Sequence, residues 1–365
     1  MSTAGSIRTS AYIRHLCSLG VPDATVIPEI VEALRQLVAA DSGIFYWAGE
    51  DFDISAVYAQ KEEVYKTYPA YCELRANGQI NQVPGDFTDW MRRRRCFANS
   101  ARVDRDFVNS AFYFEIVRPS RCRHVVVSLI EDGIRGWGAL ILTRELGRSP
   151  FSETELAAIE SFKAHIMHAL RHPQHAVSEY LDDADAAVIL ADWYGRMLHC
   201  SPSAIRLMRF AQNSTLDGDA SPQRLPEMLM PLLGRLQRLS KGEPTAEARI
   251  ETINQWGRFT WRGYPLDASA GITASPGFIL HVQHQQPRLL TSARGAHELG
   301  LSAQQQVVSV RWASGETQRD IARELGVKES TVVDHVRRVY ERLDVRDCAA
   351  LATRLTQAGA SSLSL

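Results

Sequence analysis

Residues 317–327, Thr-Gln-Arg-Asp-Ile-Ala-Arg-Glu-Leu-Gly-Val, and residues 330–338, Ser-Thr-Val-Val-Asp-His-Val-Arg-Arg, decide how the end of this chain folds. Thr317 is a residue type that caps helix N-termini. Apolar side chains follow it at helical spacing, namely Ile321, Ala322 and Leu325. Gly326 stands where this helix must stop, because glycine enters the left-handed region without steric cost. The stretch therefore predicts a short helix and a sharp turn.

A second helix follows the turn, and its two faces differ in character. The apolar face consists of Val332, Val336, Val339, Tyr340 and Leu343. The opposite face carries cations and a hydroxyl, from Thr331, His335, Arg337, Arg338 and Arg342. Two short helices around a glycine turn, with cations on the second, form the geometry that places a helix in the DNA major groove.

These residues resemble the LuxR-type (GerE- or FixJ-type) DNA-binding domain of bacterial transcription regulators. The matching positions are Leu301-Ser302, Ala313, Gly315, Ile321-Ala322, Leu325-Gly326-Val327, Thr331-Val332, His335-Val336 and Leu343-Asp344-Val345. The resemblance implies that the second helix is the recognition helix. It also implies that a fourth helix, residues 348–357 here, mediates dimer contacts through small or apolar side chains, namely Ala349, Ala350, Ala352 and Leu355.

The segment departs from the family pattern at positions that bear on DNA binding. Residues 304–307, Gln-Gln-Gln-Val, stand where the family usually has a glutamate pair, and Lys328 stands where it usually has a serine or threonine cap. Val333 replaces a common lysine or arginine, and Asp334 beside it repels phosphate. Residues 291–365 hold ten Lys and Arg against nine Asp and Glu. We therefore expect weak non-specific DNA affinity and a dimer that reads two half-sites.

The resemblance and the side-chain chemistry together predict the DNA contacts. Arg337 contacts a base edge, Val333 meets a thymine methyl group, and Asp334 accepts from a cytosine amine. The residues expected to hold phosphates are Thr317, Thr331, His335 and Arg338, and Arg319 is a further DNA-binding candidate. The alternative is a sensor or interaction protein whose helix-turn-helix end binds a protein partner, which the near-neutral charge of the segment favours.

The whole chain has the composition of an ordinary globular protein, with 365 residues, 45% hydrophobic, 23% charged and a net charge of -1. This length predicts two or three domains. The longest apolar runs are too short to span a bilayer, and residues 1–20 lack the pattern of a signal peptide, so we expect a cytoplasmic protein without membrane contact. Six scattered cysteines favour neither a disulfide framework nor a zinc knuckle.

The front of the chain has the pattern of a sensor domain. An amphipathic helix over residues 26–39 precedes a short aromatic strand, residues 44–47. Residues 123–130 and 136–143 are β-branched runs around a hairpin turn, and Ser152 with Glu155 forms a capping box for a long helix to Arg171. This order resembles a GAF domain, whose sheet backs a pocket for small molecules.

Aromatic side chains are frequent between residues 58 and 113, the segment that would cover such a pocket. Aromatic rings with a few polar groups suit an apolar or aromatic effector, although for any single ring a place in the core is the commoner outcome. The candidate ligand-lining residues are Tyr46, Tyr71, Trp90, Phe97 and Trp137. No cofactor is predicted beyond an unidentified small-molecule effector. Four helix-surface histidines, His165, His168, His172 and His175, lack the companion ligands of a metal site, so none is expected.

The middle of the chain resembles a PAS domain. The string Val-Ile-Leu-Ala-Asp at 188–192, followed by Gly195-Arg196 and Ser201-Pro202-Ser203-Ala204, looks like the opening of such a domain. Residues 258–266 and 277–283 would supply its later strands, and residues 224–233 an inserted helix. We expect this domain to couple the sensor to the output rather than to bind a cofactor.

The sequence thus predicts an α+β multidomain chain, in which two antiparallel-sheet sensor domains precede an all-α helix-turn-helix domain. The expected divisions are an N-terminal arm (1–20), a GAF-like domain (21–173), a PAS-like domain (174–284), a linker (285–298) and a LuxR-type domain (299–365). The expected function is a ligand-responsive transcriptional regulator, not an enzyme, that binds an inverted repeat in double-stranded DNA as a homodimer. RNA polymerase is a candidate further partner.

Overall fold

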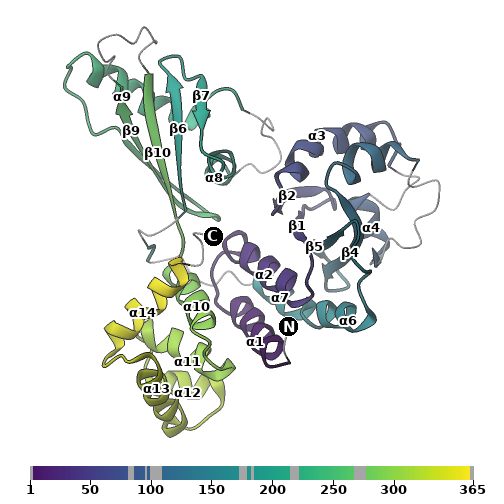
Figure 1. Ribbon diagram of the computed structural model, residues 1–365, viewed down its shortest axis with the longest axis vertical. Coiled ribbons are helices and arrows are strands. Elements are labelled where there is room, and N and C mark those ends of the chain that lie inside the picture. The colour runs from purple at the N-terminus through teal and green to yellow at the C-terminus, as the bar shows by residue number, and fades with distance from the viewer. Residues whose placement is uncertain are drawn as a thin grey trace.

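The computed structural model describes residues 3–80, 86–94, 97–98, 109–171, 179–181, 185–213, 222–266 and 277–361. The chain contains two five-stranded antiparallel sheets and ends in a bundle of helices (Figure 1). This confirms the predicted α+β class with an all-α C-terminal part.

The first sheet has the strand order β2-β1-β5-β4-β3, with every neighbouring pair antiparallel. Its strands are β1 (Ser42–Ala48), β2 (Ile54–Ala59), β3 (Phe97–Ala98), β4 (Cys122–Glu131) and β5 (Gly136–Glu145). The predicted hairpin joins β4 to β5, and Gly133 there takes a φ of 87° that other residues rarely adopt.

Helices cover both faces of the first sheet. One face packs against α2 (Asp23–Leu37), α6 (Glu153–Ser161) and α7 (Lys163–Arg171). The other face packs against α3 (Glu62–Ala76) and α4 (Phe87–Arg93), with the π-helical turn η2 (Tyr113–Val117) beside α3. The capping box of Ser152 and Glu155 is confirmed. The single helix expected after it is divided at Phe162, which ends α6.

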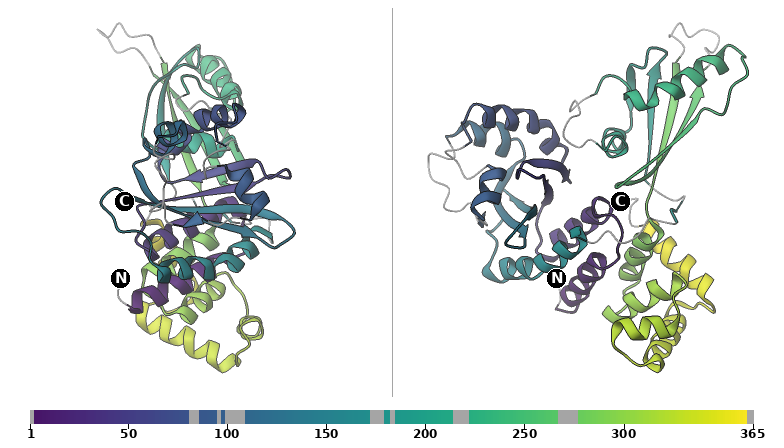
Figure 2. Two further views of the ribbon diagram at one scale, coloured as in Figure 1. Left: turned by 90° about the vertical axis from the view of Figure 1, so that its right-hand side faces the viewer. Right: turned by 180° about the vertical axis from the view of Figure 1, so that it is seen from behind.

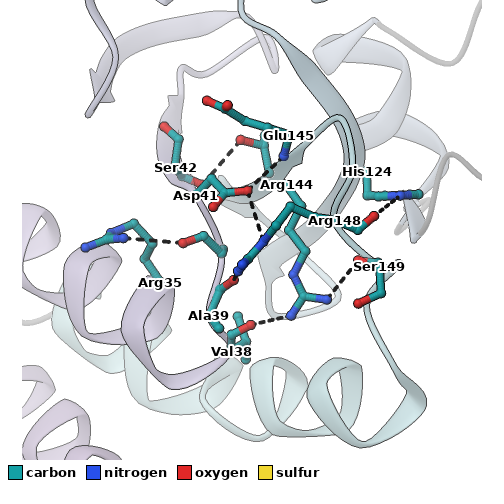
Figure 3. A network of polar contacts seen from close by, with 12 residues as sticks. Arg35, Val38, Ala39, Asp41, Ser42, His124, Arg144, Glu145, Arg148 and Ser149 are labelled. Atoms are coloured by element: carbon teal, nitrogen blue, oxygen red, sulfur yellow. Dashed lines mark hydrogen bonds and ion pairs between the residues drawn. The ribbon is translucent and has the colours of Figure 1, made fainter. Parts of the chain in front are cut away.

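Arginine side chains tie the end of α2 to the turn that follows β5 (Figure 3). Arg148 donates to the carbonyl oxygen of Ala39 at 2.7 Å. The buried Arg144 donates to the carbonyl oxygens of Val38 and Ser149. These contacts satisfy carbonyl groups that the end of a helix leaves without partners. They hold the end of α2 against the end of β5, the middle strand of the sheet.

The second sheet has the order β7-β6-β10-β9-β8 and is also antiparallel throughout. Its strands are β6 (Ala186–Asp192), β7 (Met197–Cys200), β8 (Arg249–Asn254), β9 (Gly257–Pro265) and β10 (Gly277–Gln285). The helices α8 (Ala204–Ala211) and α9 (Met230–Ser240) pack on this sheet, and the 3-10 turn η3 (Glu227–Leu229) precedes α9.

The C-terminal bundle consists of α10 (Arg288–Glu298), α11 (Ala303–Ala313), α12 (Gln318–Leu325), α13 (Glu329–Leu343) and α14 (Cys348–Ser361). Residues 285–298, expected to form a linker, instead contain α10. The polar composition of 283–288 ends before this helix, whose Leu290, Ala293 and Ala296 recur at helical spacing and form one buried face. The backbones of α10 and α14 lie close together, since a Cβ on Gly295 would fall 1.8 Å from the Leu355 oxygen.

Residues 1–20, expected to be an arm, also form a packed element. The helix α1 (Thr3–Cys17) buries Tyr12, Ile13 and Leu16. It contacts α2 and α7 on one side and α10 and α11 on the other. The view from behind in Figure 2 shows α1 and α2, in purple, between the first sheet and the bundle. The two helices therefore join the first sheet to the C-terminal bundle.

Candidate nucleic-acid interface

The first helix of the pair, α12, begins and ends where the sequence predicts. The Thr317 hydroxyl accepts from the Asp320 backbone N–H at 3.2 Å and donates to the Asp320 carboxylate at 2.6 Å. Gly326 ends the helix in the left-handed region, with φ 65°. Ile321 and Ala322 are buried against α13 and α11. These contacts set the angle at which α13 leaves the turn.

The second helix, α13, buries the predicted stripe and exposes the opposite face. Val332, Val336 and Val339 are buried in the bundle. The indole N–H of Trp312 donates to the Tyr340 hydroxyl at 2.8 Å, which fixes α13 against α11. Lys328 occupies the N-cap position without a side-chain capping hydrogen bond, as its departure from the usual Ser or Thr predicts.

The predicted DNA contacts fall into two groups. The exposed group consists of Thr317, Arg319, Val333, Asp334, Arg337 and Arg338. The half-buried group is Thr331 and His335, which line a hollow of about 450 Å³. Ala11 and His15 of α1 form part of its opposite wall. One flank of α13 thus borders a hollow that α1 also lines.

Carboxylates lie near several cations of the bundle. The Arg337 guanidinium lies 3.6 Å from the Asp334 carboxylate and 3.7 Å from that of Glu341, all three being exposed. Arg311 pairs with Glu324 and lowers the pKa of that carboxyl, chiefly through their hydrogen bond. Within the described ranges, Arg319 and Arg338 take part in no ion pair. The face is therefore locally mixed in charge, in line with the near-neutral count.

The open flank of α13 borders a second, shallower hollow of about 410 Å³. Its lining includes Gln318 at the start of α12, and Val333, Arg337 and Glu341 from α13. Two of the side chains proposed to read bases, Val333 and Arg337, thus lie beside the first turn of α12. A cation and an apolar side chain next to a helix N-terminus can engage base edges and a phosphate together.

The ligand-lining candidates do not all meet. Tyr46, Tyr71 and Trp90 belong to one cluster between the first sheet and α3 and α4. Burial raises the pKa of the Tyr71 phenol to about 12, and its oxygen accepts from the Phe87 backbone N–H at 3.3 Å. Tyr71 therefore packs as a core side chain, whereas Tyr46 and Trp90 are half-buried against the same cluster.

The two remaining candidates stand apart from this cluster. The Trp137 ring packs against the core on the other face of the sheet, the one that α2, α6 and α7 cover. The Arg135 and Arg171 guanidinium groups lie 4.4 and 5.5 Å from the centre of this ring. Phe97 pairs through its backbone with Val127, and its side chain lies outside the described residues.

The remaining expectations concern metals, thiols and membranes. Among residues that the structure describes, no three His, Cys, Asp or Glu side chains gather as metal ligands, and His172 and His175 lie outside them. Cys96 is likewise outside, and the other five cysteines are free thiols. None of the described helices combines the length and apolarity needed to cross a membrane.

Residues 299–355 match the family model described as "Bacterial regulatory proteins, luxR family". This segment is a luxR-family helix-turn-helix domain. The match covers α11 to α13 and the first part of α14, the elements that the sequence resemblance indicated. The match assigns this segment to a family of bacterial regulatory proteins.

Solved structures with detectable similarity include sensor and regulator proteins. The GAF domain of the cyanobacteriochrome TePixJ is 16% identical, covering 43% of this chain and 94% of its own, with a TM-score of 0.32. A phage VqmA–DPO complex is 18% identical, covering 48% of this chain and 85% of its own, with a TM-score of 0.20. The Vibrio cholerae VqmA dimer is 14% identical, covering 50% of this chain and 86% of its own, with a TM-score of 0.17. No curated protein matches the chain. The assignment of the C-terminal domain rests on the family match.

Proposed function

We propose that this regulator binds an inverted-repeat operator in duplex DNA as a homodimer, in response to a small molecule. The observation that carries the proposal is the exposed face of α13, on which Asp334 is exposed and Val333 and Arg337 line a hollow together with Gln318 at the capped start of α12. An exposed helix of this kind, held by a second helix at a fixed angle, fits the major groove.

Each side chain of the interface has a proposed role. Arg337 donates to a base edge, while Val333 and Asp334 discriminate thymine and cytosine. Thr317, Thr331, His335 and Arg338 hold phosphates, with Arg319 as a further contact. A nearly neutral domain gains little from phosphate neutralisation, so two domains reading two half-sites supply the affinity.

The sensing part of the proposal rests on the front of the chain. We assign residues 21–173 to a GAF-like sensor and 174–284 to a PAS-like coupling domain, with Tyr46, Tyr71 and Trp90 nearest an effector. Such a regulator works in the cytoplasm, where bacterial DNA lies, with RNA polymerase as a candidate partner. Native mass spectrometry of the purified chain tests the sensing part, because a retained small molecule would add its mass.

Selection of bound sequences from a random duplex library tests the DNA-binding part. The full chain should enrich a sequence with two-fold symmetry, and Arg337→Ala should weaken binding to it by about 1–3 kcal/mol while relaxing one base position. Arg238→Ala, which removes an exposed cation of α9 outside the luxR-family domain, is the matched control and should leave the selected base unchanged. If no sequence is enriched and the chain shows no salt-dependent binding to random duplex DNA, a protein partner for this domain is favoured instead.

A further inference from the structure

A buried ion pair connects the luxR-family domain to the helices of the first sheet. The Arg294 side chain of α10 is 5% exposed, and its guanidinium donates to Glu29 Oε1 of α2 at 3.0 and 2.5 Å. The same group donates to the Gln286 side chain at 2.7 Å and to the Gly359 carbonyl oxygen at 3.2 Å. One guanidinium therefore joins α2, α10 and α14.

A tyrosine of α1 completes this cluster. The Tyr12 hydroxyl donates to Glu29 Oε2 at 3.1 Å. Its ring stacks on His297 of α10, with centroids 4.3 Å apart and planes 9° from parallel. Burial, followed by the Glu29 charge, raises the pKa of Tyr12, so the hydroxyl keeps its proton and donates. We call Tyr12, Glu29, Arg294 and His297 the latch.

The latch makes the docking of the domain depend on charge. The hydrophobic core continues across this junction, from Ile13 and Leu16 of α1 to Leu290 and Ala293 of α10. A buried guanidinium is tolerated there only because a carboxylate neutralises it, and removing one partner leaves an uncompensated charge. Loss of the Glu29 charge would therefore favour an arrangement in which Arg294 reaches water.

The docked arrangement also covers part of the proposed DNA interface. The same α1 that carries Tyr12 forms one wall of the 450 Å³ hollow, through Ala11 and His15. Thr331 and His335 of α13 lie on the other wall and are half-buried. A duplex whose phosphates reach these two side chains has to enter this hollow, and α1 limits the access.

We infer that the latch holds the luxR-family domain in a closed state, in which α1 keeps duplex DNA from one flank of α13. The inference rests on the proposed function, because it concerns access to the same face. Opening the latch separates α10 and α11 from α1 and α2 and frees Thr331 and His335. A signal that favours the open arrangement then raises DNA affinity without changing any DNA-contacting residue.

The test measures binding of full-length variants to the selected duplex by fluorescence anisotropy. Glu29→Gln should bind tenfold or more tightly than the unmodified chain. Glu29→Gln combined with Arg294→Met should return close to the unmodified affinity, because the buried charge is gone. Glu32→Gln is the matched control, since Glu32 lies one turn away on α2 and pairs with Arg35 of the same helix. It should leave the affinity unchanged.

Hydrogen exchange of α1 separates failure of the latch from failure of the proposed function. Glu29→Gln should speed exchange across residues 5–17, and the double variant should restore protection. Equal duplex binding by all variants would overturn the inference while keeping the proposed function. If no variant binds any duplex, the proposed function fails, and unchanged exchange in Glu29→Gln would overturn the latch as well. Should Glu29→Gln not fold, Tyr12→Ala weakens the latch from α1 and is read the same way.

Discussion

The side chains of Asp334 and Arg337 lie one helical turn apart on the exposed face of α13, with carboxylate and guanidinium 3.6 Å from each other. Glu341 lies 3.7 Å from the other side of the same guanidinium. Exposed ion pairs of this kind are weak, so they restrain the Arg337 side chain but still allow it to exchange a carboxylate for a base. In the proposed complex this arrangement favours selectivity over affinity, because on a wrong sequence Arg337 stays paired with Asp334 and Glu341.

Asp334→Asn should raise the affinity for random duplex DNA. The substitution removes a charge that repels phosphate and one that pairs with Arg337, while an amide still fits the surface. We expect a gain of about 1 kcal/mol at low salt and weaker preference for the selected sequence, in the range of exposed charge interactions. Anisotropy titrations at several salt concentrations measure both effects.

Glu50→Gln provides the comparison for this change. It removes one exposed carboxylate from the turn after β1, far along the chain from the luxR-family domain. An equal gain in both variants would mean that net charge alone is responsible and that Asp334 has no special place at the duplex.

Gly295→Ala should destabilise the junction of α10 and α14. A Cβ there would lie 1.8 Å from the Leu355 carbonyl oxygen and 2.7 Å from its carbon, so the two backbones must separate. We expect a loss of about 3 kcal/mol or more, the range of severe overpacking. Gly234→Ala in α9 meets nothing within 4 Å and should stabilise by about 0.5–1 kcal/mol. Urea denaturation measures the free energy of unfolding of both variants. Equal changes in the two would contradict the expected backbone clash at Gly295.

Local signals in the sequence predicted the elements of the candidate site. Thr317 and Gly326 mark the ends of α12 because capping and left-handed backbone depend on the residue itself. The valine stripe of α13 and the hairpin between β4 and β5 follow from periodicity in the same way. Each of these signals acts over fewer than about ten residues, as helix and turn patterns do.

Contacts between distant segments could not be predicted in this way. Glu29 and Arg294 are separated by 265 positions, and from its neighbours in the sequence each is predicted to be an exposed charge. The polar run before Arg288 concealed a buried helix, although Leu290, Ala293 and Ala296 recur at helical spacing. The sequence likewise predicted that Thr331 and His335 contact the duplex, and nothing in it indicated that α1 lines the same hollow as these side chains.

The contact between the two sheets offers a further prediction. The Trp256 ring stacks on Phe210 at 4.4 Å and meets Trp47 of β1 edge-on at 5.6 Å. Trp256→Ala should cost about 3–5 kcal/mol, because this buried ring supports both the second sheet and its contact with the first. Thermal denaturation should then show the two sheets unfolding in separate steps. One cooperative step, merely shifted to lower temperature, would mean that Trp47 and Trp256 do not join them.

Acid should open the junction between α1 and the luxR-family domain. Burial, with Arg311 nearby, lowers the pKa of His15 to about 4, and burial with Arg8 nearby does the same for His297. Both imidazoles are therefore neutral in the closed state, whereas a solvated histidine takes up a proton near pH 6.5. Stability from these groups is complete above pH 6.5 and decreases as the pH falls toward 4. For the buried His15 the loss at pH 5 is about 2 kcal/mol.

The measurement is hydrogen exchange of α1 between pH 7 and pH 5, corrected for the intrinsic pH dependence of exchange. Protection should decrease on acidification in the unmodified chain and decrease less in His15→Phe, whose ring cannot be protonated. His199→Phe changes an exposed histidine of β7 and should keep the full pH response. If His15→Phe loses protection over the same pH range as the unmodified chain, proton uptake at His15 does not open the junction, and another group titrates there.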